Sequence, residues 1–278
     1  MIGTERGTGW KVVGYLGMAL AILFIGVPLV WIVLTSFKSH GEIYSVPARW
    51  WPTEFRWENY RDVFTRVDFA DYFINSIVIT VVLCTIKIIL GVISAYALAI
   101  LRFPGRNIVF IIVISALMVP SEVTVISNYA LASQLGWRDT YTGIIVPLAG
   151  IAFGTFLMRN HFMSIPREIV EAARMDGAGP FRLLFQVLLP ISLPTLVAFS
   201  MITVVNEWNQ YLWPFLMAET SRSATLPVGL TMLQNNDGIS NWGPVMAATI
   251  MTMIPVLLLF LALNKYMIKG LTSGAVKG

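Results

Sequence analysis

Residues Tyr72–Leu101 read YFINSIVITVVLCTIKIILGVISAYALAIL, and Lys87 is the only charged residue in this stretch. An α-helix rises about 1.5 Å per residue, so about 20 apolar residues cross a hydrocarbon core about 30 Å thick. Lipid offers no hydrogen-bond partner to the backbone, so a stretch of this kind must be helical where it meets lipid. We therefore predict a transmembrane helix here.

Five other stretches have the same apolar character. They are Val12–Phe37, Asn107–Ser121 with the apolar residues that follow Glu122, Thr140–Met158, Leu183–Asn206 and Gly238–Asn264. The sequence thus predicts an all-α polytopic membrane protein with six transmembrane helices, forming one domain over residues 1–278. The approximate spans are 12–37, 72–101, 107–127, 140–161, 192–217 and 243–267. Pro120 and Pro147 are expected to kink the third and fourth spans, since proline removes a helical hydrogen bond.

The composition excludes several other classes of protein. Hydrophobic residues make up 56% of the 278 residues and charged residues only 12%, whereas soluble domains carry about 25% charged residues. The low share of charged residues excludes a soluble globular enzyme. A disordered chain is excluded as well, because disordered chains are poor in apolar residues. One cysteine and two histidines allow neither an internal disulfide nor a zinc site, so no metal site is predicted.

The basic residues indicate the orientation in the membrane. With the N-terminus inside, the inner segments carry 11 Lys and Arg residues and the outer segments carry 7. Cytoplasmic loops are enriched in these residues, so we predict a multi-pass protein of the plasma (cell) membrane with both termini cytoplasmic. The net charge of +4 then reflects topology, and no nucleic acid partner is expected.

Lys87 and Glu207 lie near the middle of the second and fifth spans. A charge at this depth costs roughly 2.5–3.5 kcal/mol, so each should face protein or water. One interpretation is structural, with the two side chains paired between helices or Lys87 reaching toward the interface. The other is that span five lines a translocation path, on which Asn206, Glu207, Asn209, Tyr211 and Lys87 would touch a solute.

The segment 164–190 is organised beyond what a connector requires. Pro166 suits the first turn of a helix, Gly177 suits a left-handed cap, and Gly179-Pro180 predicts a turn. Ile169, Ala172 and Ala173 fall on one helical face. A second short helix should run from Phe181 until Pro190. We predict two short helices at the inner membrane face, a shape suited to another protein's cleft.

This segment resembles the EAA loop of binding-protein-dependent ABC importer permeases. Glu171-Ala172-Ala173, Gly177 and Val187-Leu188-Leu189-Pro190 follow the family pattern E-A-A-x3-G-x9-I-x-L-P, with Val187 in place of the usual isoleucine. Further motifs look like the carbohydrate-uptake branch of the maltose-permease G type: Asn75-Ser76, Ala95-Tyr96-Ala97-Leu98, Arg102-Phe103-Pro104-Gly105, Met118-Val119-Pro120 and Gly270-Leu271-Thr272. Asn206–Pro214 and Leu226–Leu230 look most like glycerol-3-phosphate or glycerophosphodiester permeases.

The resemblance implies a type I ABC importer permease fold and a heteromeric machine. Its other members would be a second permease, two cytoplasmic ATPase subunits and an extracytoplasmic solute-binding protein, with lipid around the spans. The helix Glu171–Gly177 would be a coupling helix in a groove of the ATPase. The implied coupling residues are Glu171, Ala172, Ala173, Arg174, Asp176, Gly177 and Phe181.

The chain itself is not expected to be an enzyme. No glycine-lysine pair occurs, so there is no phosphate-binding loop of the Walker type. No cofactor is expected on this chain, and ATP and Mg would be bound by the partner ATPase.

The expected function is to form half of the translocation path for a small polar solute. The resemblance favours glycerol-3-phosphate or a glycerophosphodiester such as glycerophosphocholine. A sugar or oligosaccharide of the maltose or trehalose type is the alternative. A secondary transporter should show inverted repeats, which the sequence lacks. A membrane-embedded enzyme should show a nucleophile–base or metal constellation, and none is visible in the sequence.

Overall fold

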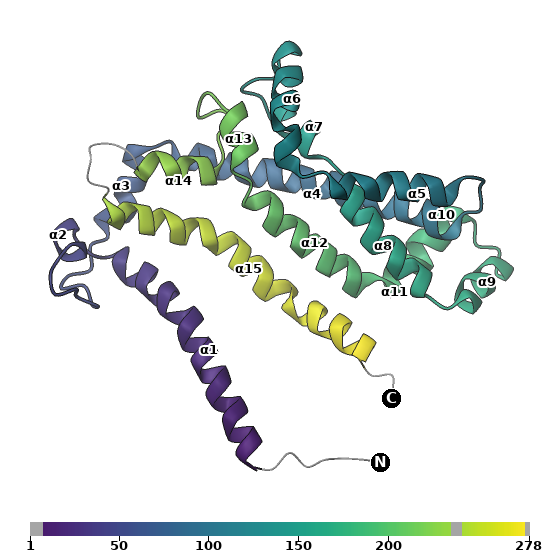
Figure 1. Ribbon diagram of the computed structural model, residues 1–278, viewed down its shortest axis with the longest axis horizontal. Coiled ribbons are helices and arrows are strands. Elements are labelled where there is room, and N and C mark those ends of the chain that lie inside the picture. The colour runs from purple at the N-terminus through teal and green to yellow at the C-terminus, as the bar shows by residue number, and fades with distance from the viewer. Residues whose placement is uncertain (1–7, 235–240, 276–278) are drawn as a thin grey trace. The chain divides into compact units, whose positions relative to one another are not determined.

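The computed structural model describes residues 8–234 and 241–275, and within them the regular structure is helical (Figure 1). Two compact units are present. The first takes in the described residues up to Asp68 together with Leu230–Met253, and the second takes in Phe69–Gly229 together with the described residues from Ile254. The all-α prediction is confirmed.

The helices follow one another along the chain with short connections. Up to residue 134 they are α1 (Thr8–Thr35), α2 (His40–Ile43), α3 (Glu58–Arg66), α4 (Phe69–Ile100), α5 (Arg106–Ser115), the 3-10 helix η1 (Ala116–Met118) and α6 (Ser121–Gln134). Next come α7 (Tyr141–Leu148), α8 (Ala152–Ser164), α9 (Arg167–Met175), α10 (Pro180–Arg182), the π-helix η2 (Leu183–Leu188) and α11 (Leu189–Ile191). The last are α12 (Leu193–Trp208), α13 (Leu212–Met217), α14 (Leu226–Gln234) and α15 (Trp242–Ala275).

Three stretches are long and apolar enough to cross a membrane as single helices: Val12–Thr35, Phe69–Ile100 and Trp242–Lys265. Three further candidates are pairs of helices bent at a short break. These are Arg106–Met118 with Glu122–Gln134 (97°), Tyr141–Leu148 with Ala152–Ser164 (42°) and Pro180–Ile191 with Leu193–Met217 (81°). The first two bends lie at Pro120 and just after Pro147, as expected. If each bent pair is one span, the described residues contain six spans. The predicted span bounds and the single domain stay predictions.

Helix α1 shows why such segments need lipid. Side chains along it are largely bare, with Leu20 67% exposed, Ile22 70% and Phe24 83%. None of the residues in its most apolar 18-residue window is buried within the protein. An apolar helix without a polar face is stable only where its surroundings are apolar.

Helix α4 is the centre of the second unit, and it packs most extensively on α8 and then on α12. Gly91 of α4 and Gly154 of α8 allow the two backbones to approach closely, because a Cβ on Gly91 would lie 3.2 Å from the Cα of Gly154. Phe199 of α12 is buried against the same point. Hydroxyls of Ser94 and Thr155 are 2.6 Å apart between α4 and α8. Small residues with an interhelical hydrogen bond are typical of packing within membranes.

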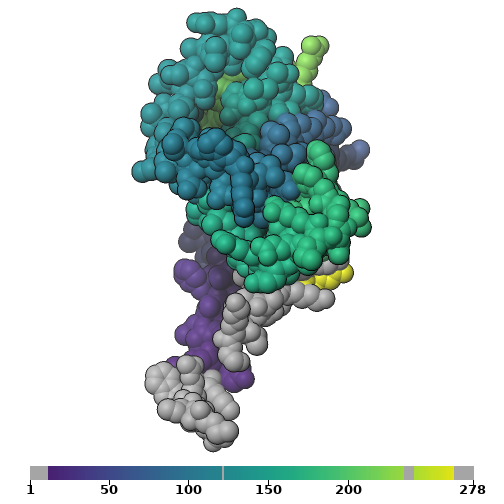
Figure 2. All heavy atoms as spheres, turned by 90° about the vertical axis from the view of Figure 1, so that its right-hand side faces the viewer, coloured from purple at the N-terminus to yellow at the C-terminus, as the bar shows by residue number. Residues whose placement is uncertain are grey.

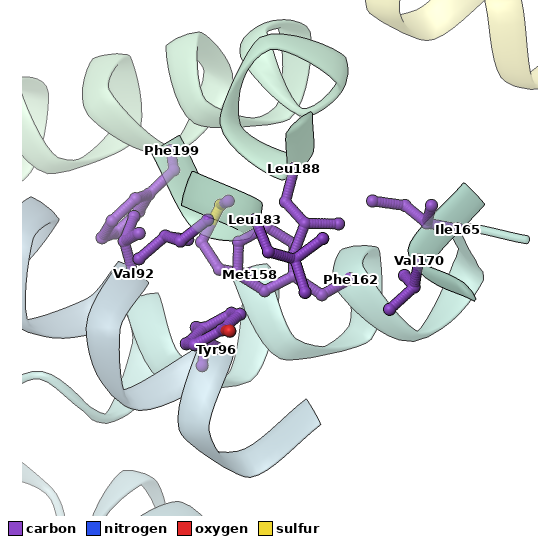
Figure 3. Close-up of a cluster of buried hydrophobic side chains, with 11 residues drawn as sticks. Val92, Tyr96, Met158, Phe162, Ile165, Val170, Leu183, Leu188 and Phe199 are labelled. Carbon is purple, nitrogen blue, oxygen red and sulfur yellow. The ribbon is translucent and has the colours of Figure 1, made fainter. Parts of the chain in front are cut away.

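A cluster of buried apolar side chains joins α4, α8 and α12 to the segment that follows α8. We call it the α9 cluster, and Figure 3 shows its side chains converging from these helices. Its members are Val92, Ala95, Tyr96, Met158, Phe162, Ile165, Val170, Leu183, Leu184, Leu188 and Phe199. The cluster holds the two short helices of segment 164–190 against the ends of the longer helices.

Candidate coupling segment and embedded charges

Helix α9 begins and ends where its sequence predicts. Pro166 occupies the N-cap position, and Gly177 adopts the left-handed conformation with φ +76°. The N–H of Gly177 donates to the carbonyl of Arg174 at 3.0 Å, and the N–H of Ala178 donates to the carbonyl of Ala173 at 3.0 Å. This is a Schellman cap, which satisfies the last carbonyls of the helix and favours glycine at the left-handed position.

The face by which α9 packs differs from the one that Ile169, Ala172 and Ala173 suggest. Val170 is buried and belongs to the α9 cluster, and Ala173 packs against that cluster. Ile169 is 37% exposed and Ala172 is also exposed. Val170 and Ala173 are three residues apart and therefore share one helical face, and this is the face that packs.

The second short helix runs from Pro180 to Ile191 and contains a π-helical stretch, Leu183–Leu188. Leu183, Leu184 and Leu188 are buried in the α9 cluster. A π-helical turn is rare, and it is often found at functional sites. The predicted helix is confirmed, and it ends one residue after Pro190.

Two large apolar side chains of the segment stand free of the core. Phe181 is 80% exposed and Met175 is 89% exposed. The segment thus presents apolar side chains on a support that the α9 cluster fixes in place, which is a typical arrangement for contact with a partner. Phe181 is among the residues predicted from sequence, whereas Met175 is missed. Only Val170 of α9 is buried, and the sequence carries no signal that separates Met175 from a buried methionine.

The other predicted coupling residues lie on one continuous segment. Glu171, Ala172, Arg174, Asp176 and Gly177 are exposed, and Ala173 is partly buried. Figure 1 places α9 and α10 beyond one end of α4, α8 and α12. The residues are therefore brought together and accessible.

Lys87 of α4 and Glu207 of α12 form an ion pair, with Lys87 Nζ 2.6 Å from Glu207 Oε1. The side chains are 17% and 4% exposed respectively. The interhelical pair that the sequence left open is therefore present, and it lowers the cost of placing two charges among apolar helices. Glu207 Oε2 is buried and makes no hydrogen bond within the described part of the chain.

The remaining pathway candidates are more accessible than Glu207. Asn206, Asn209 and Tyr211 are exposed, whereas Glu207 is buried. Helix α12 ends at Trp208, and α13 begins at Leu212. Asn209 and Tyr211 thus lie in the break between two helices, and Asn206 lies in the last turn before it. Broken helices with free backbone groups are typical of binding sites in transporters.

Two sequence motifs meet at the other end of α4, which sequence reasoning did not foresee. Asn75 Nδ2 donates to the carbonyls of Ser221 at 2.8 Å and Ala224 at 2.9 Å. Ser76 Oγ accepts the N–H of Leu226 at 2.8 Å, and Tyr141 donates its hydroxyl to Asn75 Oδ1 at 2.5 Å. Asn75-Ser76 therefore holds the start of the Leu226–Leu230 motif in place.

Asp139 secures the same loop from the other side. Its Oδ1 accepts the N–H groups of Glu219 and Thr220 and the Ser223 hydroxyl, and its Oδ2 accepts the Thr220 hydroxyl at 2.6 Å. Burial raises the pKa of this carboxyl, but the hydrogen bonds, led by that of Ser223, outweigh it and lower the pKa to about 2. The loop 218–224 is thus tied to the segment just before α7 by one ionised carboxylate.

Among the described residues, no group of three or more His, Cys, Asp or Glu side chains could hold a metal ion. The apolar helices, the packed segment 164–190 and the embedded ion pair together define a polytopic membrane protein.

Comparison with known proteins identifies the family. Residues 87–273 match the family described as "binding-protein-dependent transport system inner membrane component", and the chain belongs to this family. It is 34% identical over 274 residues to the sn-glycerol-3-phosphate transport system permease protein UgpE of Pectobacterium atrosepticum, covering 96% of this chain and 98% of that protein. It is 31% identical to the probable ABC transporter permease protein YurM of Bacillus subtilis, covering 93% and 86%. The predicted resemblance is confirmed.

Solved structures show the same fold. A chain of a bacterial ABC transporter involved in the import of the acidic polysaccharide alginate matches with a TM-score of 0.83 and 25% identity, covering 96% of this chain and 99% of that one. A second chain comes from a bacterial alginate ABC transporter in complex with an alginate-pentasaccharide-bound periplasmic protein; it matches with a TM-score of 0.68, 14% identity and coverage of 92% and 93%. The chain therefore has the ABC importer permease fold and is a permease component of such a transporter.

Proposed function

We propose that this permease forms half of the translocation path of an ATP-driven importer for glycerol-3-phosphate or a glycerophosphodiester. The 34% identity to glycerol-3-phosphate permeases over nearly the whole length supports this substrate class. In this proposal the other half of the path is a second permease, and a solute-binding protein delivers the solute. Both termini are cytoplasmic, so segment 164–190 faces the cytoplasm.

The proposed energy source is a partner ATPase pair that binds ATP and Mg. The observation that carries this proposal is that Met175 and Phe181 are exposed on a segment that packs against the α9 cluster. In the proposal α9 fits a groove of the ATPase, with Glu171, Arg174 and Asp176 at its rim and the exposed Ala172 allowing close approach. Closure of the ATPases would then move the packed helices as a unit.

Co-purification after mild detergent extraction tests this partner. An ATPase chain should accompany the wild-type protein, and Glu171→Lys or Gly177→Asp should reduce the ATPase recovered per permease several-fold. Glu54→Lys is the matched control, because Glu54 is exposed in segment 38–68, which the proposed orientation places outside. Undiminished recovery in the Glu171→Lys and Gly177→Asp variants, or active transport by the chain alone, would overturn the proposal.

For the path itself we propose the residues around the α12–α13 break, Asn206, Asn209 and Tyr211, together with the Lys87–Glu207 pair. Glu207 neutralises the charge of Lys87. A phosphate group on the solute would therefore meet hydrogen-bond donors at this place in the path and no unpaired cation. Uptake of radiolabelled solute should fall several-fold in Asn209→Ala and Glu207→Gln, at equal amounts of assembled complex. Full uptake rates in both variants would remove these residues from the path.

A sugar or oligosaccharide is the second candidate substrate, and the structural similarity to an alginate importer favours it. Uptake assays that compare glycerol-3-phosphate, glycerophosphocholine and maltose discriminate the two. Competition by the glycerol phosphates alone supports the first proposal, and competition by the sugar alone supports the second.

A further inference from the structure

A cavity of about 850 Å³ lies where the end of α4, the start of α5, the end of α8 and α9 meet. Figure 2 views the molecule from this side and shows the region of α5 in blue-teal beside the α9–α10 segment in green. Residues 167, 170, 171 and 174 of α9 line the cavity, and they share one face of that helix because they are three or four positions apart.

The cavity is strongly basic. Arg102, Arg106, Arg167 and Arg174 line it, and Glu171 is the only acidic residue among its lining side chains. None of these four arginines takes part in an ion pair within residues 8–234 and 241–275. Four guanidinium groups around one space, opposed by a single carboxylate, favour an anion there.

One of the arginines is already held in position. Arg106 Nη1 donates to the carbonyls of Ala99 at 3.3 Å and Leu101 at 3.2 Å, at the end of α4. These neutral partners fix the side chain without cancelling its charge. Arg102, Arg167 and Arg174 are exposed, so their charged groups are accessible to an incoming ligand.

The surroundings of the cavity are apolar along α5. Phe103 and Ile108 line it beside the arginines. Along α5, Ile108 is 64% exposed, Ile111 58% and Ile112 66%. A ligand with an anionic head and apolar chains would thus find a basic cavity and a bare apolar helix side by side.

We propose that this cavity binds the phosphate head group of an anionic phospholipid, with the acyl chains lying along α5. Basic pockets between membrane helices on the cytoplasmic side are suited to such head groups. The phospholipid would come from the inner leaflet, a point that rests on the orientation given under the proposed function. A soluble phosphate ester would use the arginines but not the exposed isoleucines of α5, so the continuous apolar face favours the lipid.

Native mass spectrometry of the assembled transporter tests the proposal. The complex is reconstituted in nanodiscs of phosphatidylglycerol and phosphatidylcholine, extracted into detergent, and examined for retained lipid. Wild-type complex should retain phosphatidylglycerol in preference to phosphatidylcholine. The double change Arg102→Gln and Arg167→Gln should lower that retention at least about tenfold, because each basic residue near a membrane surface contributes about one kcal/mol.

The matched control is the double change Arg61→Gln and Arg222→Gln. It removes the same charge from exposed positions outside the cavity, and retention should be unchanged. Arg102 and Arg167 lie outside the proposed coupling residues, so ATPase recovery in the first variant separates this proposal from the proposed function.

Three outcomes would overturn the proposal. The first is equal retention in wild type and in the Arg102/Arg167 variant. The second is loss of the retained lipid on adding millimolar inorganic phosphate, which would assign the cavity to soluble phosphate. The third is retention by the permease pair alone and not by the complex with the ATPase, which would make the cavity a protein-docking surface.

Discussion

Among individual residues, Lys87 and Glu207 form an ion pair that is buried between apolar helices. Their 2.6 Å contact joins α4 to α12, two helices that also meet at Phe199. Breaking a buried pair from one side leaves an uncompensated charge, which is more costly than replacing both partners by apolar groups.

We predict that Lys87→Met alone lowers the stability of the purified protein by about 3 kcal/mol, because Glu207 is then left buried and unpaired. The double change Lys87→Met with Glu207→Leu should recover most of this loss. Thermal unfolding in detergent, followed by tryptophan fluorescence, measures both. If the two single changes add without recovery in the double variant, the pair does not contribute as an interacting unit.

At the scale of elements, the crossing of α4 and α8 depends on the absence of side chains. A Cβ on Gly154 would overlap the ring of Phe199, whereas a Cβ on Gly150 would meet nothing within 4 Å. The two glycines, four residues apart, therefore form a matched pair for substitution.

We predict that Gly154→Ala destabilises the protein by about 1–3 kcal/mol, because overpacking forces the α4, α8 and α12 contacts apart. Gly150→Ala should change stability by less than about 0.5 kcal/mol. Denaturation midpoints in detergent provide the comparison. Equal midpoints for the two variants would show that Phe199 moves aside without cost.

The packing of elements also shows how far sequence patterns can be taken. The cap at Gly177 and the breaks near Pro120 and Pro147 are predicted correctly, because backbone conformation there depends on glycine and proline themselves. The packed face of α9 is not predicted correctly. Val170 is buried in a cluster with residues of other helices, such as Phe162 and Leu188, and the local sequence does not specify these neighbours. The π-helical turn Leu183–Leu188 likewise has no local sequence signal.

For the molecule as a whole, two ionised carboxylates hold connecting segments in place. Asp139 has a pKa of about 2 through the hydrogen bonds described above. Glu42 also has a pKa of about 2, held there first by Thr53 and then by the N–H of Ser39, against the opposing effect of burial. Each segment is therefore stabilised by the charged form of its acid.

We predict that the stability supplied by these two carboxylates is lost as the pH drops from about 4.5 toward 2. A depressed folded-state pKa contributes stability above the unfolded value, 4.5 for Glu42 and 3.8 for Asp139, and this contribution is lost as the folded form takes up protons. Thermal midpoints across this range measure it. The variant Glu42→Gln with Asp139→Asn should be less stable at pH 7 and decline less steeply; an unchanged slope would contradict the assignment.

The sequence by itself determined the class of protein, because apolar length, the placement of charge and the spacing of one inner motif are local properties that the membrane and the backbone impose. The tertiary structure decided which residues act together. Only folding brings Lys87 to Glu207, Asn75 to the loop before Leu226, and Arg102 to the same cavity as Arg174. Such contacts join residues far apart in the chain, and their energy depends on distance in space.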